Sequence, residues 1–485
     1  MSFLVSLLRH CLRGLFTLSF FSCALFFVVG EARAQCPVVD NIGWGRGATV
    51  RFFLNANLNE EQKRQVRWGL AEWTRANSVN NSRVRFEEDF TGGNFQFHIL
   101  NGSLGGNTPA FANKVFSSDG TVVSGTLTFD PNAVFGGTNT LIANPTQAGY
   151  ETFIIKLTLH EVGHTMGLDH PALPPGGICA QQDGLTVMNY ICNVNDSANN
   201  MPVRVAECDQ SAINSETRYP AFTQSPNPID ESTFFVRQHY LDFLNREPDA
   251  GGLSFWVNNI ESCGANADCR NTRRIDTSAA FFLSIEFQET GYFVYRVYQA
   301  AFGDLPNKPV PLTIQEFLPE TQRVGRNVIV GLGDWQGQID ANKNAFISEL
   351  MARGRFSALY PSTMPPEQFV DTLNANAGGV LSASERNTLV GDLTAAGNTT
   401  QARASILRRV AEDADLVQRE FSPAFVLMQY YGYLRRSPDD PPDADFRGWQ
   451  FWLDKLNTFN GDWRGAQMVA SFLSSLEYRR RFGQP

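Results

Sequence analysis

The stretch LTLHEVGHTMGLDH, residues Leu157 to His170, holds three of the six histidines in the chain. His160 and His164 are four positions apart, so on a helix they lie on one face, one turn apart. Two imidazoles at this spacing can bind one Zn2+. Gly167 allows the backbone to leave the helix, so His170 can return as a third nitrogen ligand. The sequence therefore predicts a metal site with the ligands His160, His164 and His170.

Glu161 follows the first of these ligands and is not itself a ligand in this arrangement. A carboxylate at this position can act as the general base that takes a proton from an attacking water. Three protein ligands leave one coordination position open, which is typical of a catalytic zinc ion and not of a structural one. A bare HExxH arises by chance in about one chain in a hundred of this length, and the added Gly167 and His170 lower that frequency by several hundredfold.

The motif HEVGHTMGLDH resembles the HExxHxxGxxH signature of the metzincin zinc proteases, and TVMNY places Met188 where their methionine turn is expected. The resemblance implies that Met188 forms an apolar floor beneath the ligands. It also implies a catalytic role for Tyr190, which is similar to the tyrosine that some astacin-like and serralysin-like members use as a switchable extra ligand. The alternative for Tyr190 is a tyrosine packed under the turn.

This resemblance implies a zinc metalloendopeptidase that hydrolyses a protein or peptide substrate with one catalytic Zn2+ and Glu161 as general base. Structural zinc and calcium ligands of the matrixin kind are not recognisable, so Ca2+ is not indicated. The matrixin cysteine switch is absent as well, and Cys36, which could replace it, is expected in a disulfide. The stretch GTLTFDPN, residues 125–132, is similar to the matrixin edge strand on which a peptide substrate lies.

Around the motif, the pattern predicts an α+β domain over residues 35–218. Asn59 and Gln62 form a capping box at the start of an amphipathic helix, and the active-site helix is expected to begin near Thr152. Alternating apolar residues predict strands in TVRFFL (49–54), RVRFEE (83–88), NFQFHIL (94–100) and GTLTFDPN. The order of these elements predicts a mixed sheet with helices packed on it.

After a proline-rich linker at residues 219–230, the chain reads as helix and repeats itself. FVRQHYLDFLNREPD, from Phe235, aligns without gaps with FVLMQYYGYLRRSPD, from Phe425. An internal duplication of this length predicts an all-α duplicated domain with copies at 231–360 and 361–485. It resembles a helical domain of unknown function, akin to phycobilisome linker domains, that is found in secreted bacterial proteins. Its tyrosines and tryptophans are expected in the core, and the alternative is a surface on which aromatic residues stack on glycans.

The first 34 residues have the order of a secretory signal peptide. Arg9 and Arg13 precede an apolar run at 15–30, and Ala32-Arg33-Ala34 forms a small-x-small cleavage site. An uncleaved membrane anchor is the rival interpretation, but the run is short for a span. We therefore expect a bacterial protein exported to the extracellular space, with the periplasm and the cell surface as alternatives. Because no later segment is long and apolar enough to span a bilayer, no stable membrane insertion is expected after cleavage.

Six cysteines remain after residue 34, which in an oxidising compartment indicates up to three disulfides. Cys263 and Cys269 enclose a short loop and are the expected pair. The other four allow three pairings, which the sequence leaves open; they are Cys36, Cys179, Cys192 and Cys208.

The formal net charge of −9 and the lack of a basic stripe exclude nucleic acid as the main partner. Attachment to a cell surface or polymer through the helical repeats is a second candidate role. The rival to an enzyme is a secreted adhesion or scaffold protein that acts through these repeats, and the intact Glu161 argues against it.

Overall fold

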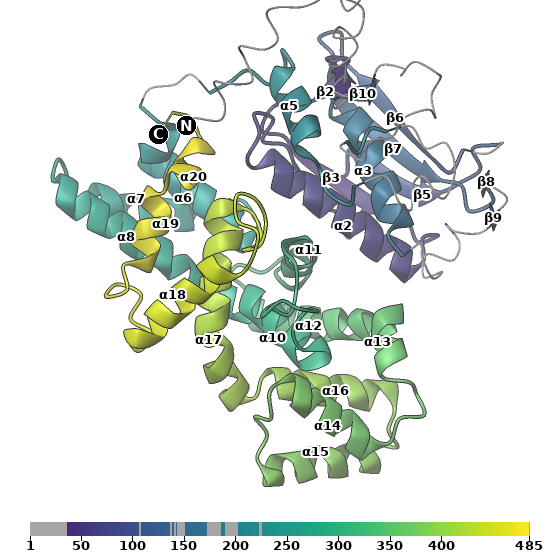
Figure 1. Cartoon of the computed structure of the whole chain (residues 1–485), viewed down its shortest axis with the longest axis vertical. Helices are drawn as coiled ribbons and strands as arrows, with labels where there is room; N and C mark the ends of the chain where they lie inside the picture. Colours follow the sequence, from purple (N-terminus) through teal and green to yellow (C-terminus); the bar gives the residue numbers. More distant parts are fainter. Residues whose placement is uncertain are drawn as a thin grey trace, which may run out of the picture. The chain divides into compact units, whose positions relative to one another are not determined.

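The structure, a computed structural model, describes residues 36–105, 108–135, 138–139, 142, 151–171, 186–189, 202–222 and 226–484. The predicted signal peptide, Tyr190, Cys179 and Cys192 lie outside these ranges. The described part is mixed α/β in its N-terminal half and mostly helical in its C-terminal half (Figure 1).

The N-terminal half is built around a six-stranded sheet. Its strands are β2 (Gly43–Trp44), β3 (Thr49–Leu54), β4 (Arg85–Glu88), β5 (Phe97–Asn101), β6 (Ala110–Phe116) and β7 (Thr121–Phe129). The parallel strands follow the order β2-β7-β5-β3-β4, and β6 pairs antiparallel with β7. Four short strands form two further pairs: β1 (Pro37–Val39) with β10 (Leu168–Pro171), which carries the third histidine, and β8 (Val134–Phe135) with β9 (Thr138–Asn139). The predicted mixed sheet is confirmed.

Among the described residues, three helices accompany the sheet, namely α2 (Glu60–Asn77), α3 (Phe153–Thr165) and α5 (Glu207–Ser215). The predicted capping box starts α2: Asn59 accepts from the backbone N–H of Gln62, whose side chain accepts from the backbone N–H of Asn59. The Trp73 indole of α2 is fully buried and donates to the Leu159 carbonyl of α3 at 2.9 Å. The two helices therefore share one core with the sheet.

The edge strand differs from the expectation. GTLTFDPN was expected at the edge, but β7 is paired on both sides, with β5 and with β6. Among the described strands β6 pairs with β7 alone, so β6 is the edge. The sequence pattern of β6 does not predict this edge strand, because Phe111, Val115 and Phe116 are about half exposed while Lys114 reaches inward to α3. A sequence pattern detects a strand from apolar side chains that face inward and polar side chains that face outward, and β6 has the reverse arrangement.

The helical half begins with a 3-10 turn, η1 (Pro228–Asp230), and ends with α20. Its first helices are α6 (Ser232–His239), α7 (Ala250–Glu261), α8 (Ala267–Leu283), α9 (Ile285–Glu289) and α10 (Gly291–Phe302). They are followed by α11 (Ile314–Val324), α12 (Trp335–Ala352), α13 (Gly354–Leu359), α14 (Pro366–Asn376), α15 (Ala383–Ala395) and α16 (Thr400–Ala411). The last are α17 (Ala414–Gln429), α18 (Arg447–Thr458), α19 (Met468–Ser474) and α20 (Leu476–Arg480).

The aligned segments of the helical half share unusual backbone features. Helix α6 continues into a π-helical turn, η2 (Tyr240–Leu244), and α17 continues into η3 (Tyr430–Leu434). Each turn ends on a left-handed residue, Asn245 at φ 55° and Arg435 at φ 56°. The matching backbone features lie within α6–α9 in the first copy and α17–α20 in the second. The predicted boundary between the two copies, at residues 360/361, stays a prediction.

The aromatic residues of the repeats divide between core and surface. Tyr240 and Tyr430 are buried as expected, and Trp256 and Trp452 pack against the same core. Phe255 and Phe451 are instead 62% and 58% exposed. The core position expected for the tyrosines and tryptophans is confirmed for these four residues, and in both copies the phenylalanine beside the tryptophan lies on the outer side of its helix.

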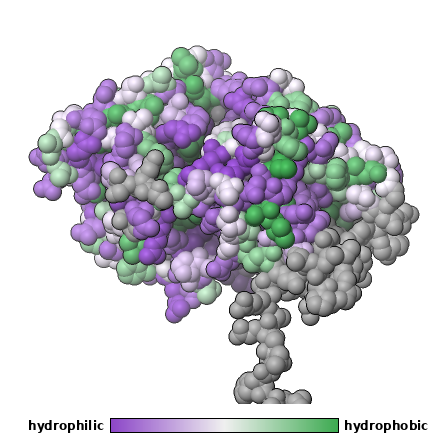
Figure 2. Space-filling view, turned by 90° about the horizontal axis from the view of Figure 1, so that it is seen from above, coloured by the Kyte–Doolittle hydropathy of each residue, from purple (hydrophilic) through white to green (hydrophobic). Residues whose placement is uncertain are grey.

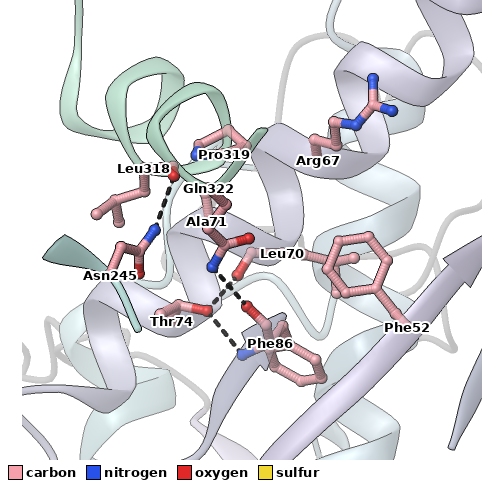
Figure 3. Close-up of a pocket in the computed structure, with 10 residues that line it drawn as sticks. All are labelled: Phe52, Arg67, Leu70, Ala71, Thr74, Phe86, Asn245, Leu318, Pro319 and Gln322. Carbon is pink, nitrogen blue, oxygen red and sulfur yellow. Dashed lines mark hydrogen bonds between the residues drawn. The ribbon is translucent and has the colours of Figure 1, made fainter. Parts of the chain in front are cut away.

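Residues from Cys36 onward form one compact unit, in which α2 also packs against the helical half. Ala71 of α2 belongs to the apolar core of the helical half. Figure 3 shows this contact, where Gln322 of α11 approaches the carbonyl of Phe86 on β4. Arg67 of α2 donates to Glu88 at 2.7 Å and to Glu349 of α12 at 3.0 Å. These contacts join the two halves, and the predicted linker between residues 218 and 230 stays a prediction.

Two disulfides are present among the described residues. Cys263–Cys269 confirms the expected pair, and Cys36 bonds to Cys208. The second bond selects one of the three pairings that the sequence left open and engages the thiol of Cys36.

Hydrophobic residues form small groups among hydrophilic ones on the face drawn in Figure 2. Among the described residues, no helix combines the length and the apolar character needed to cross a membrane.

Candidate metal centre

Helix α3 and strand β10 supply the three predicted ligands. Helix α3 is buried along nearly its whole length, which fixes the positions of His160 and His164 one turn apart. Gly167 then reverses the chain with φ +92°, where a Cβ atom would lie 2.1 Å from a carboxylate oxygen of Glu216. Only glycine fits this turn without strain, and the turn leads into β10, which carries His170.

The three imidazoles converge. Each offers a ring nitrogen within 4.8 Å of the others, and the ring centroids are 4.8 to 5.0 Å apart. The Nε2 atoms of His160 and His170 are 3.1 Å apart. The predicted clustering of these three side chains is confirmed.

Backbone carbonyls orient two of the rings. His160 Nδ1 lies 2.9 Å from the carbonyl of Val187, and His164 Nδ1 lies 2.9 Å from that of Leu168. A carbonyl only accepts, so each Nδ1 carries a proton and each Nε2 keeps its lone pair. The third ring has its Nδ1 3.3 Å from the carboxylate of Asp169. The lone pairs therefore face the centre of the cluster.

Burial keeps these rings neutral. It lowers the pKa of His160 well below the ordinary value, and the neighbouring imidazoles lower it further. Burial also lowers the pKa of His164, and together with the nearby His164 it lowers that of His170 to about 4. Neutral imidazole is the form that binds a metal ion.

Glu161 lies beside the cluster without joining it. Its side chain is buried, and Oε2 accepts from the backbone N–H of Ala112 on β6 at 2.7 Å. Burial raises the pKa of Glu161 to about 7, although this hydrogen bond acts in the opposite direction. The carboxylate is thus tied to the edge strand and is oriented by it.

Met188 packs directly against α3 between the first two ligands. It is fully buried, and a Cβ atom on Gly163 would lie 2.2 Å from its sulfur. Asp209 of α5 holds the preceding residues, since it accepts from the Thr186 hydroxyl and from the Val187 backbone N–H. This anchor fixes the carbonyl that orients His160.

Lys114 of β6 is a second link between the edge strand and α3. Its ammonium donates to the carbonyl of His164 at 2.7 Å and to the carboxylate of Asp40 at 2.6 Å. No sequence motif marks Lys114, Ala112 or Asp209 as part of the site. Ala112 acts through a backbone N–H, which any residue except proline provides, so its identity carries no signal.

The donor set fits a zinc ion. Three neutral imidazoles with inward lone pairs, two of them fixed by carbonyls, match the ligand type and number of an open zinc site. Among the described histidine, cysteine and acidic side chains, these three histidines form the group that is close enough to hold a metal ion. Tyr190 lies outside the described residues, so its predicted role stays a prediction.

No protein-family model matches the chain, and no curated protein matches it.

Proposed function

We propose that this protein is a zinc metalloendopeptidase of the metzincin type. The observation that carries the proposal is the convergence of three oriented imidazoles beside a buried carboxylate that is not a ligand. A structural zinc site has no use for such a neighbour, whereas a hydrolase needs a base there.

His160, His164 and His170 would hold the ion. A zinc ion in such a site acts as a Lewis acid that polarises a carbonyl group and makes water acidic enough to deprotonate near neutral pH. Glu161 would take the proton from the attacking water and deliver it to the leaving amine. The hydrogen bond from Ala112 leaves the other carboxylate oxygen of Glu161 available for this transfer.

We propose that the peptide substrate lies along β6. This strand is paired with β7 alone among the described strands and is tied to Glu161 and to the ligand helix. An extended peptide can add to such an edge as a further strand, which would bring its backbone to the carboxylate.

The test is hydrolysis of casein by the purified full chain. We expect activity that a zinc chelator abolishes and that added Zn2+ restores. Glu161→Gln should retain zinc, measured by elemental analysis, and lose at least a hundredfold in turnover, since general-base catalysis contributes about 10²–10⁴-fold. Glu367→Gln, an exposed change on α14, is the matched control. Hydrolysis by zinc-loaded Glu161→Gln at the control rate would refute the mechanism.

The rival role, attachment through the helical repeats, is favoured by one observation. The exposed Phe255 and Phe451 occupy equivalent positions in the two copies. If attachment were the whole function, Phe255→Ser together with Phe451→Ser would abolish retention on the cell surface, and the wild-type chain would not hydrolyse casein.

Export is part of the proposal. The two described disulfides suit an oxidising compartment. N-terminal sequencing of the protein from culture medium should begin at Gln35. A mature chain that begins at Met1 would contradict cleavage.

A further inference from the structure

A cavity of about 310 Å³ lies away from the metal centre and is lined by both halves of the described chain. Residues around β3 and β4 form one wall, and residues of α6, η2 and the end of the chain form the other. Its charged lining consists of five arginines and one aspartate: Arg46, Arg83, Arg85, Arg237, Arg435 and Asp242. The cavity is therefore strongly positive.

The one acidic group of the lining is already occupied. Asp242 is buried and accepts two hydrogen bonds from Arg481, at 2.9 and 3.0 Å. Its carboxylate also lies 3.8 Å from Arg435. Two guanidinium groups thus share one carboxylate, and the exposed Arg237 is paired with Glu247 outside the cavity.

The remaining arginines have no acidic partner among the described residues. Arg85 is 9% exposed; one of its terminal nitrogens donates to Asn245, and the other, Nη1, has no hydrogen-bond partner in the described part of the chain. Arg46 Nη2 and Arg83 Nε are likewise buried without a partner there. The Arg46 guanidinium lies 3.7 Å above the ring of Phe222, and that of Arg83 lies 4.9 Å from the same ring. The aromatic ring keeps both side chains at the cavity.

A guanidinium group does not lose its proton in proteins, so buried positive charge has to be balanced by an anion. Burial, together with the nearby charge of Arg481, lowers the pKa of Arg83 to about 9. Burial also lowers the pKa of Arg46 and Arg85. Burial is the largest cause in each case, and for Arg83 and Arg85 the acidic groups nearby, Asp242 among them, act in the opposite direction without offsetting it.

We propose that this cavity binds a tetrahedral oxyanion, a phosphate or sulfate group, through Arg46, Arg83 and Arg85. Guanidinium groups bind such oxygens with paired, charge-assisted hydrogen bonds, and the cavity is large enough for the group and part of a carrier. Because its walls come from both halves, the bound anion links them. The site does not involve the metal ligands, so Glu161→Gln leaves it intact.

The experiment compares thermal unfolding and isothermal titration of the full chain in sodium sulfate, in sodium phosphate and in sodium chloride of equal ionic strength. At a concentration tenfold above the dissociation constant, sulfate or phosphate should raise the melting temperature by about 2 °C relative to chloride. Arg85→Gln should weaken binding at least tenfold. Arg46→Gln, which is less buried, repeats the test in case Arg85→Gln does not fold.

Arg386→Gln is the control, since Arg386 is partly exposed, lies outside the cavity and is paired with Asp371. It should keep the full sulfate response. A sulfated disaccharide forms a third arm: tighter binding than inorganic sulfate identifies a group carried on a saccharide, and equal binding identifies the free anion. Equal melting temperatures in chloride, sulfate and phosphate, or an unchanged response in both arginine variants, would overturn the proposal.

Discussion

Two buried regions of the molecule treat polar side chains in opposite ways. Around α2, α11 and α12 they meet groups of opposite charge: Arg353 reaches Glu320 at 2.5 Å and Glu349 at 3.2 Å, and all three are largely buried. Around α3, three imidazoles face one another. His164 and His170 lower the pKa of His160, and His164 lowers the pKa of His170. A fold that keeps such like groups together gains nothing from their mutual contact, which is why this arrangement indicates a binding role.

Removal of one imidazole should have the largest effect. We expect His170→Ala to weaken zinc binding by roughly a thousandfold or more, since one of three ligands carries about a third of a binding free energy of about 10–16 kcal/mol. Metal analysis after mild chelation measures this, with His98→Ala on β5 as the control that keeps zinc. Full retention by His170→Ala would point to another third ligand, and Asp169 is the first candidate.

Removal of one member of a buried ion pair should come next. Arg67→Ala leaves Glu88 without its partner at 5% side-chain exposure, and it removes one of three arginines from Glu349, which keeps Arg323 and Arg353. We expect the free energy of unfolding to fall by about 3 kcal/mol or more, measured in urea. Arg386→Ala breaks the exposed pair with Asp371 and should cost less than about 1 kcal/mol. Similar losses in the two variants would contradict the contrast between buried and exposed pairs.

The smallest effect concerns His239, a buried histidine of the helical half. Its ring nitrogens lie 2.7 Å from the carbonyl of Phe235 and 2.6 Å from the hydroxyl of Ser278. Burial lowers its pKa to about 4. The unfolded chain therefore binds a proton first as the pH falls below about 6.5, and stability is lost between pH 6.5 and 4 by up to about 3 kcal/mol.

The second copy provides the matched substitution. Gln429 occupies the equivalent position and donates to the carbonyl of Phe425 at 2.9 Å, as His239 does to Phe235. His239→Gln should therefore fold and should flatten the pH dependence of urea unfolding in this window. An unchanged slope between pH 4 and 6.5 would show that other groups cause the acid sensitivity.

Local patterns predicted the elements that contain the candidate site. The capping box at Asn59, the strand at 49–54 and the helix after Thr152 are confirmed because each depends on neighbouring residues. The clustering of the histidines followed from helical spacing and one glycine. These features need no knowledge of distant contacts.

Features that depend on distant parts of the chain could not be predicted. The edge strand β6 has its apolar side chains on the exposed side, so its sequence pattern does not indicate which side of the strand faces the core. The partner of Glu161 is a backbone N–H, and the pairing of Cys36 with Cys208 is one of three that spacing allows. Arg46, Arg83 and Arg85 lie far from Asp242 in sequence, and only the fold brings them together around one cavity.

The disulfide between Cys36 and Cys208 closes a ring of chain with a sequence separation of 172 residues, and this ring contains the three histidines, Glu161 and Met188. Inside it, β1 pairs with β10, the strand of His170. If the proposed protease activity is present, one molecule can cut another, and a single cut within this ring would leave both pieces covalently joined. A nicked molecule should therefore migrate as one species without reductant and as two with it, and the strand that bears the third histidine would remain attached.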